Sequence, residues 1–304
     1  MTHTALLCIG NITVDDAVLP DGTRRNACLG GDVIYAGLAA RLFEPQVRLL
    51  APLGSDLPPP AAAALERAGL ALAGFLRRDR PNIRNTVTYL ADGSRVWDLW
   101  HGEAHFEAMS VWPADLDADA VAAPAVLFLA MALAPQLACA QALPGGGGRT
   151  VYLDLQEDYI YGHHAEVAEM VRLSDVFLPS EEEVWRLLGH RDLAAAAREF
   201  AHWGPSVVVI KRAGAGCLVY QRADDSLTQV PARPAVVVDS TGAGDAFCGA
   251  FAAVHHRTGD AVQAARAGAV AASCAIGGFG VEAMTGLTRQ QVEDDLAEWG
   301  RTDG

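Results

Sequence analysis

Short apolar runs alternate with helix-like segments along most of this chain, and this alternation limits the possible folds more than any other feature. Residues 5–9 form an apolar run closed by Gly10, the pattern of a strand covered on both faces. Helical patterns cover residues 33–43 and 60–68 and separate most of the later apolar runs. We therefore predict an α/β fold with one doubly wound, mostly parallel sheet flanked by helices. Its further strands are expected at residues 47–50, 125–129, 151–155, 176–178, 207–211 and 217–220.

Two polar stretches interrupt this rhythm. Residues 15–26 contain Pro20-Asp21-Gly22, and residues 86–100 alternate around Asp92-Gly93, which is the turn chemistry of hairpins. We predict that they form a small antiparallel β lid, with lid segments at approximately 12–27 and 77–100. No break in composition marks a second unit, so residues 1–304 are expected to form a single domain.

The composition is that of a folded chain with an acidic surface. Hydrophobic residues make up 51% and charged residues 20%, which argues against disorder. The formal net charge of -14 disfavours nucleic acid and anionic membrane surfaces as partners. The longest apolar run, residues 125–134, is too short to cross a bilayer, and residues 1–4 lack the basic start of a signal peptide. We expect a cytoplasmic protein, with no C-x-x-C pair among its six cysteines to suggest a zinc ribbon or a disulfide framework.

Residues 236–251 are the most informative part of the sequence. An apolar segment at 236–238 is expected to be a strand that turns through small residues into a helix. Glycines in such a turn let backbone N–H groups converge on an anion, and we expect Gly244 to need backbone angles that a β-branched residue resists. Asp245, in the first turn, is placed to accept a proton from a hydroxyl that attacks a bound phosphoryl group. The alternative is that Asp245 only caps the helix.

The stretch Asp239-Ser-Thr-Gly-Ala-Gly-Asp245, followed by Ala-Phe-Cys-Gly-Ala-Phe, resembles the C-terminal signature of the PfkB, or ribokinase-like, carbohydrate kinases. The resemblance implies a ribokinase-like fold and ATP-dependent transfer of the γ-phosphoryl group to a hydroxyl, expected to be primary, of a sugar or sugar-like molecule. It makes Asp245 the general base and ATP and Mg²⁺ the cofactors. The amides of Gly242, Ala243 and Gly244 would form the anion hole, with Thr241 on the nucleotide side.

Motifs nearer the N-terminus resemble the acceptor side of the same family. Gly10-Asn11 followed by Asp15 looks like the exit of the family's first strand, and Gly30-Gly31 looks like its di-glycine motif. Tyr35 stands where many relatives have Asn, which places a bulky ring on the sugar-facing helix. The resemblance implies that the acceptor is bound by Asn11, Asp15, Gly30, Gly31 and Tyr35.

Motifs further along the chain resemble the nucleotide side. Ser180 to Glu183 is similar to N-x-x-E, with Ser180 in place of Asn and Glu183 acting indirectly on Mg²⁺. Lys211 to Gly216 resembles the T/K-x-G-x-x-G turn, with Ala213 in place of its first glycine. The resemblance implies that Ser180, Glu183, Lys211, Ala213 and Gly216 bind the nucleotide.

Two further implications concern charge. In several sugar-kinase branches of this family, a D-x-N-x-R pattern stands where this chain has residues 154–158. This chain lacks the arginine of that pattern, which an acidic or phosphorylated sugar would need, so a neutral acceptor is favoured. The resemblance also places Asp239 where a carboxylate, with carbonyls of residues 275–280, holds K⁺. The alternative is that Asp239 only caps its turn.

The residues leave alternatives open. A nucleoside kinase of the same fold is favoured if Tyr35 and the lid residues Trp97 and Trp100 grip a base. A catalytically silent sugar or nucleotide sensor would follow if Ser180 and Ala213 have weakened phosphate handling. A homodimer through the exposed edges of the lid is a further expectation.

Overall fold

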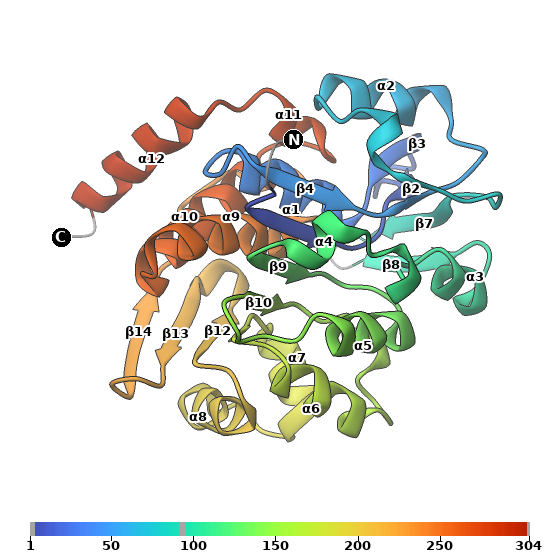
Figure 1. The fold of residues 1–304 in the computed structure, drawn as a ribbon. Coiled ribbons are helices and arrows are strands. Elements are labelled where there is room, and N and C mark those ends of the chain that lie inside the picture. The colour runs from blue at the N-terminus through green and yellow to red at the C-terminus, as the bar shows by residue number, and fades with distance from the viewer. Residues whose placement is uncertain (1–3, 91–94, 303–304) are drawn as a thin grey trace.

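The computed structural model describes residues 4–90 and 95–302, and in it a long β-sheet lies between two layers of helices (Figure 1). Within the described residues this main sheet has eight strands in the order β14-β13-β12-β11-β10-β9-β1-β4. Pairing is parallel from β4 to β12 and antiparallel at β13 and β14, which confirms the predicted fold class. The strands are β1 (Leu6–Ile9), β4 (Val47–Leu50), β9 (Ala125–Phe128), β10 (Thr150–Leu153), β11 (Val176–Phe177), β12 (Val207–Lys211), β13 (Cys217–Gln221) and β14 (Ser226–Val230).

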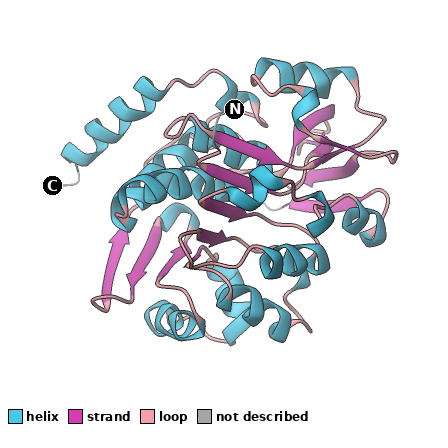
Figure 2. Cartoon of the chain, viewed as in Figure 1, coloured by secondary structure: helices cyan, strands magenta, loops and turns pink. Residues whose placement is uncertain are grey.

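Successive side chains of β1 point into two different cores, as expected for a strand covered on both faces. Leu6 and Cys8 pack with the layer that contains α1, α9 and α10, whereas Leu7 and Ile9 pack with the layer that contains α4 to α8 (Figure 2). The helices are α1 (Asp32–Arg41), α2 (Pro59–Arg67), α3 (Glu103–Ala108), α4 (Ala118–Ala122), α5 (Leu133–Ala142), α6 (His164–Arg172), α7 (Glu181–Leu188), α8 (Leu193–Trp203), α9 (Ala243–Thr258), α10 (Ala261–Ala275), α11 (Glu282–Thr285) and α12 (Arg289–Thr302). In the part of the chain that the structure describes, none of these helices has the length and apolarity needed to span a membrane.

A second, smaller sheet, which we call the lid sheet, has the order β3-β2-β7-β8. Its strands are β2 (Thr13–Val18), β3 (Arg24–Gly30), β7 (Ile83–Tyr89) and β8 (Arg95–Leu99). The expectation of a purely antiparallel lid is wrong, because β2 and β7 pair in parallel where the two predicted hairpins meet. The predicted turn Asp92-Gly93 lies outside the described residues. A separate short pair, β5 (Pro52–Leu53) and β6 (Leu76–Arg77), is also parallel.

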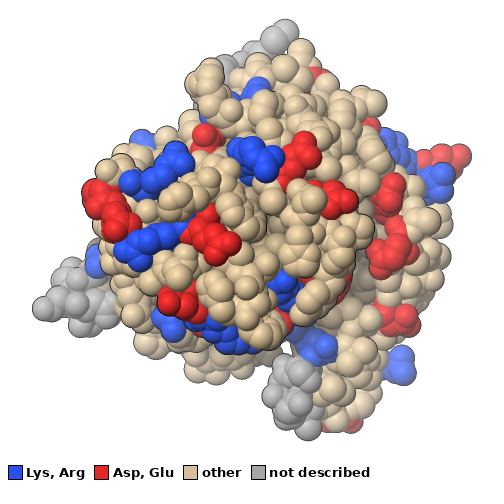
Figure 3. All heavy atoms as spheres, turned by 90° about the horizontal axis from the view of Figure 1, so that it is seen from below, with Lys and Arg blue, Asp and Glu red and all other residues tan. Residues whose placement is uncertain are grey.

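Surface charges of both signs are mixed on the face seen in Figure 3. Among the described residues drawn there, acidic side chains lie between the basic ones, and no continuous basic stripe crosses this face. A basic stripe is the usual footprint of a protein that binds a nucleic-acid backbone.

Helices α1 and α9 approach each other unusually closely. The contact point is Gly249, where an added Cβ would overlap the backbone carbonyl of Ala36 in α1. Both helices carry almost wholly buried residues, including Ala36, Phe247 and Phe251. The close approach matters because α9 begins within the motif Asp239 to Asp245, and α1 begins at the di-glycine motif.

We expect Gly249→Ala to lower the free energy of unfolding by about 1–3 kcal/mol, because two backbones would have to separate in a packed core. Urea unfolding of the purified protein measures this. Gly74→Ala is the matched control, since an added Cβ there would have no heavy atom within 4 Å. Equal stability losses in the two variants would contradict the close-packing argument.

Candidate active site

Polar residues follow adjacent parallel strands of the main sheet and meet at one edge. Asn11 follows β1, Asp154 follows β10, Ser180 follows β11, and Lys211 is the last residue of β12. Neighbouring parallel strands end at the same edge, which is where open α/β sheets bind ligands. The amino end of α9, with Asp245 in its first turn, joins them there.

The backbone turn before α9 creates a helix start with free amides. Gly242 has a φ of 76°, and its carbonyl accepts the first helical hydrogen bond, from the Ala246 N–H at 2.9 Å. The preceding amides of the first turn therefore have no helical partner. The expectation for Gly244 is wrong, because the unusual φ is at Gly242, while Gly244 lies inside the helix. An added Cβ at Gly244 would meet only Lys211 Nζ, at 3.8 Å, whereas one at Gly242 would overlap the ring of Tyr35.

Asp239 holds this turn in place and connects it to two other parts of the chain. Its Oδ1 accepts hydrogen bonds from the Thr241 N–H at 2.9 Å and from the Tyr89 hydroxyl at 3.0 Å. Its Oδ2 accepts one from the Gly280 N–H at 3.2 Å. Asp239 is buried, so it fixes the turn against both the end of β7 and the loop that follows α10.

The predicted strand at residues 236–238 is wrong. The described chain forms no strand between β14 and α9, and Val236, Val237 and Val238 are exposed by 82%, 63% and 58%. The segment pairs with no described strand, and the Val238 N–H instead donates to the carbonyl of Ile276, in the loop after α10, at 2.8 Å. Its apolar residues have the composition of a strand, but a strand also requires a partner.

A cavity of about 400 Å³ lies between the lid sheet and the edge of the main sheet. Four of the predicted acceptor residues line it together with Asp245 and Thr241, so the structure brings the two groups of motifs together. Gly30 lies beside the cavity, where an added Cβ would overlap the Asp15 carboxylate. The polar lining is Asn11, Thr13, Asp15, Asp32, Asn85, Thr241 and Asp245, along with Gly31 and Tyr35. The apolar lining is Ile83, Trp97, Leu99, Phe106 and Ala130. Glu103, Gln156, Glu157 and Asp158 complete the lining.

Three carboxyl groups at the bottom of this cavity have raised pKa values, mainly because they are buried. Burial raises the pKa of Asp15 to about 6, although a hydrogen bond from Asn85 opposes the shift. Burial and the nearby charge of Asp154 raise the pKa of Asp245 to about 6. Burial and the charge of Asp245 raise the pKa of Asp32 well above its ordinary value. Asp245 is therefore a stronger base than a solvated aspartate.

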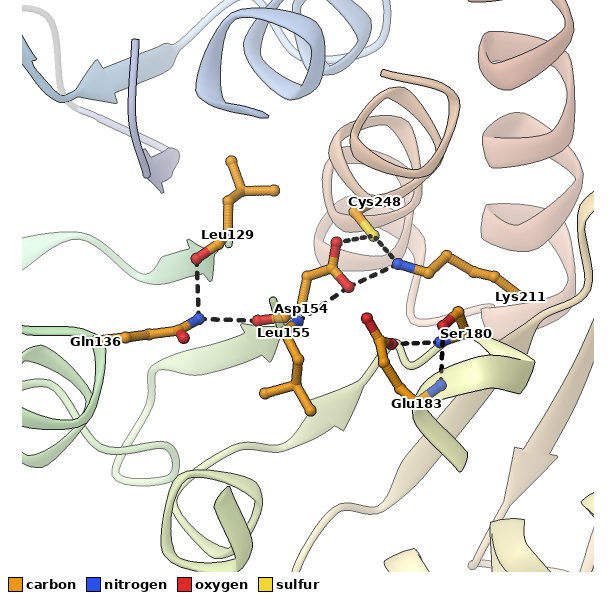
Figure 4. A network of polar contacts seen from close by, with 8 residues as sticks. All are labelled: Leu129, Gln136, Asp154, Leu155, Ser180, Glu183, Lys211 and Cys248. Atoms are coloured by element: carbon orange, nitrogen blue, oxygen red, sulfur yellow. Dashed lines mark hydrogen bonds and ion pairs between the residues drawn. The ribbon is translucent and has the colours of Figure 1, made fainter. Parts of the chain in front are cut away.

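A buried ion pair lies on the other side of the α9 terminus (Figure 4). Lys211, the only lysine of the sequence, places Nζ 2.6 Å from Asp154 Oδ1, with side chains only 15% and 5% exposed. The thiol of Cys248 is 3.4 Å from Asp154 Oδ2 and 3.5 Å from Lys211 Nζ. Gln136 Nε2 donates to the carbonyls of Leu129 and Asp154, both at 2.8 Å, and so fixes the backbone that carries the carboxylate. The ammonium group is therefore held close to the amides of the α9 turn.

Ser180 and Glu183 form a capping box at the start of α7, as Figure 4 shows. The Ser180 N–H donates to Glu183 Oε2 at 2.6 Å, and the Glu183 N–H donates to Ser180 Oγ at 3.2 Å. Burial raises the pKa of Glu183 to about 7, while the charge of Lys211 lowers it and that of Asp154 raises it. The serine that replaces the family asparagine thus serves as a helix cap.

The turn after β12 is closed by a backbone hydrogen bond around Ala213. This residue has a φ of 45°, a left-handed conformation that costs a residue with a Cβ roughly 1–2 kcal/mol. Gly216 has a φ of 84°, and an added Cβ there would overlap the Val230 carbonyl. The Arg212 N–H donates to the Gly216 carbonyl at 2.8 Å and closes the turn.

Three further residues, Asp32, Asn85 and Tyr89, belong to the site but are not among the predicted site residues. Asp32 follows the di-glycine motif directly and accepts the Asn11 N–H at 2.9 Å, so its position was a usable signal. Asn85 and Tyr89 carry no such signal, because they lie on lid strands far from any motif and reach the site only through the fold.

A second cavity, of about 450 Å³, lies at the opposite end of β1 and β4. Its lining includes Thr4, Arg41 and Arg48 and contains none of the motif residues.

Comparisons with known proteins agree with this geometry. Residues 134–285 match the pfkB family carbohydrate kinase. The cytidine kinase of Thermococcus kodakarensis is 30% identical over 259 residues, which cover 83% of this chain and 88% of that protein.

The fold is shared with solved structures of lower identity. The nucleoside kinase of Burkholderia thailandensis in complex with inosine has a TM-score of 0.80 at 19% identity and covers 96% of this chain and 97% of its own. The ribokinase of Arabidopsis thaliana complexed with ribose and ATP has a TM-score of 0.76 at 23% identity. The match covers 97% of this chain and 99% of that ribokinase. The chain belongs to the pfkB family of carbohydrate kinases and is a carbohydrate or nucleoside kinase.

Proposed function

We propose that this enzyme transfers the γ-phosphoryl group of ATP to a hydroxyl, primary in our proposal, of a sugar or sugar-like molecule, with Asp245 as general base. One observation carries the proposal: Asp245 lies in the first turn of α9, beside the free amides, and also lines the acceptor cavity. A proton acceptor and an anion site therefore meet where an acceptor hydroxyl would face a phosphoryl group.

In this reaction the acceptor oxygen forms a bond to the γ-phosphorus and its proton moves to Asp245. The bond between the γ-phosphorus and the β–γ bridging oxygen breaks, and ADP leaves. The amides of Gly242, Ala243 and Gly244 would stabilise the charge on the transferred group, because amides fixed in advance need no reorganisation. Thr241 would complete the nucleotide side of this turn.

The nucleotide side is supported by a cation and a well-formed turn. Lys211, held by Asp154, faces the α9 amides and would neutralise phosphate charge. Ser180 and Glu183 would support this region from α7, and the turn that carries Ala213 and Gly216 would border the nucleotide.

Mg²⁺ is the proposed metal cofactor. The described residues contain no group of three or more His, Cys, Asp or Glu side chains placed to hold a metal ion. This fits Mg²⁺, which protein sites commonly hold through substrate phosphates and one or two carboxylates. When bound, Mg²⁺ neutralises phosphate oxygens and polarises the phosphoryl group. Glu183 would act on it indirectly.

On the acceptor side, the residues of the cavity floor would bind the sugar ring. Asp15, Asn11 and Tyr35 line the cavity together with Gly31, whose missing Cβ lets the chain pass close to the backbone of Asn11. The acidic lining disfavours a phosphorylated or carboxylate acceptor, so we propose a neutral one.

A nucleoside is the second candidate acceptor, and the apolar lining of the cavity favours it. Trp97, Leu99 and Phe106 line the cavity together with its polar residues, and a free sugar has no large apolar surface to place against them. The similar cytidine kinase of Thermococcus kodakarensis supports the same candidate.

Further proposals concern the whole molecule. We propose a homodimer through the lid sheet, since β8 is an edge strand and Val96 and Trp97 are 54% and 49% exposed. We also propose that the enzyme works in the cytoplasm.

A coupled assay of ADP release across pentoses, hexoses and nucleosides tests the acceptor. We expect ADP release with at least one of these classes. Faster release with a nucleoside than with its own free pentose would select the second candidate. If no acceptor releases ADP while one of them still raises the melting temperature, the chain is a silent sensor and the proposed transfer is wrong.

Asp245→Asn keeps the shape of the side chain and removes its basicity, so turnover should fall by about 10²–10⁴-fold with little change in ATP affinity. The wild-type rate should fall as the pH drops through about 6, because protonated Asp245 cannot accept the proton. With an aspartate of ordinary pKa, the rate would instead stay at its full value until the pH falls to about 4. Steady-state kinetics measure both effects, with Asp21→Asn in an exposed lid turn as the control. Unchanged turnover in Asp245→Asn would remove this residue from the mechanism.

We propose K⁺ near Asp239 as a further cofactor, held with carbonyls of residues 275–280. Asp239 accepts hydrogen bonds from Tyr89, Thr241 and Gly280, and these bonds support the alternative, in which Asp239 only caps its turn. If K⁺ binds, turnover should be faster in potassium than in sodium or tetramethylammonium at equal ionic strength, and Asp239→Ala should abolish the difference. Equal wild-type rates in all three salts would leave Asp239 with the structural role only.

A further inference from the structure

The second cavity, of about 450 Å³, lies beside β4, the edge strand of the main sheet, at the end away from the acceptor cavity. Its lining comes from the end of α1, the amino end of β4, α4 and the segment after α2, elements labelled in Figure 1. Small-molecule sites have volumes of about 300–1,000 Å³, so this cavity has the size of one. Gly69 and Gly74 leave room in it, because an added Cβ at either would have no heavy atom within 4 Å.

The charged lining of this second cavity is mainly basic, unlike that of the acceptor cavity. Its charged residues are Arg41, Arg48 and Asp119, two cations and one anion. The chain as a whole has a formal net charge of -14, and the described lining of the acceptor cavity contains carboxylates but no lysine, arginine or histidine. An anion is therefore disfavoured in the acceptor cavity and favoured in the second cavity.

Of the two arginines, Arg48 is already paired. Its Nη1 and Nη2 donate to the two carboxylate oxygens of Asp117, both at 2.7 Å, and Nη1 also lies 3.2 Å from Asp119 Oδ2. The hydrogen bond to Asp117 raises the pKa of Arg48. The Thr4 hydroxyl donates to Asp119 Oδ2 at 2.7 Å. These contacts join β4 to α4, so Arg48 belongs to the wall of the cavity.

Arg41, in the last turn of α1, has no such partner. In the described ranges no carboxylate lies within ion-pair distance of its guanidinium, whose only hydrogen bond is a long one, from Nη1 to the Gly69 carbonyl at 3.4 Å. The side chain is partly buried, and this burial lowers the pKa of Arg41. A guanidinium stays charged under these conditions, so the cavity contains a cation with free N–H donors and no counter-ion from the chain.

We propose that the second cavity is a binding site for a small carboxylate with an apolar body, and that Arg41 binds the carboxylate group. A planar guanidinium matches the two oxygens of a carboxylate with parallel hydrogen bonds. Leu49, Leu70 and Phe75 line the cavity and would contact the apolar body. The inference does not depend on the proposed phosphoryl transfer, since no residue is shared between the two cavities.

The charges around Arg41 favour a carboxylate over a phosphate ester. A phosphate monoester carries a charge of about -1.5 to -2 at pH 7, whereas a carboxylate carries a single charge. Only one guanidinium is unpaired, and Asp119 also lines the cavity. The carbonyl end of α1, which carries Arg41, further opposes a second negative charge.

The test is calorimetry on the full chain with phenylacetate as the probe. We expect a dissociation constant of about 1 mM or tighter for this small ligand. Phenylacetamide, which is neutral, acetate, which lacks the apolar body, and phenyl phosphate, which has the larger charge, should each bind at least about 10-fold more weakly. Arg41→Gln should weaken phenylacetate binding by at least about 10-fold, with Arg41→Lys between it and the wild type. Arg67→Gln, at an exposed arginine of α2 outside the lining, is the matched control and should bind like the wild type.

Asp245→Asn shows which cavity the probe occupies, because Asp245 lines only the acceptor cavity. Its affinity for phenylacetate should equal that of the wild type, and an altered affinity would place the probe in the acceptor cavity and overturn the proposal. Equal binding by the wild type and a folded Arg41→Gln would also overturn it, as would equal binding of phenylacetate and phenylacetamide by the wild type. Tighter binding of phenyl phosphate would overturn the carboxylate as the ligand class. The melting temperature shows whether Arg41→Gln is folded, and the comparison of probes on the wild type decides the matter if it is not.

Discussion

Parallel strands that end at one edge of the main sheet are the constraint on which the rest of this structure depends. The run from β4 to β12 leaves its carboxyl ends side by side, so Asn11, Asp154 and Lys211 come together although they are far apart in sequence. The close crossing of α1 and α9 at Gly249 then sets the amino end of α9 over the same edge. A shift of either helix would move Asp245 relative to the cavity that it lines.

Burial at this edge explains both the basicity and the charge balance of the site. Several carboxyls lie close together in a confined space, and desolvation raises the pKa values of Asp15, Asp245 and Glu183. The Lys211–Asp154 pair offsets part of this crowding. In the proposed function this arrangement separates two tasks, because the lysine would serve the nucleotide and the acidic lining would face the acceptor.

The lid sheet joins these two sides. Its β2 and β7 strands contribute Asp15 and Asn85 to the cavity floor, whereas Tyr89 and Arg95 bind the turn before α9. The parallel pairing of β2 with β7 makes this possible, because it brings two hairpins from distant segments into one sheet. A single strand, β8, therefore contacts both the cavity and the turn before α9.

The sequence by itself determined the α/β class, most of the strands of the main sheet and the helix that begins near Asp245, because these depend on local apolar patterns and on glycine chemistry. It did not determine whether an apolar segment has a neighbouring strand to pair with. Residues 236–238 therefore resembled a strand, although the tertiary structure leaves them exposed. It also did not reveal that Ala213 takes up a left-handed conformation or that Asp154 pairs with Lys211. Contacts between residues as distant as Tyr89 and Asp239 depend on the packing of whole sheets, and only the tertiary structure decides which side chains such packing brings together.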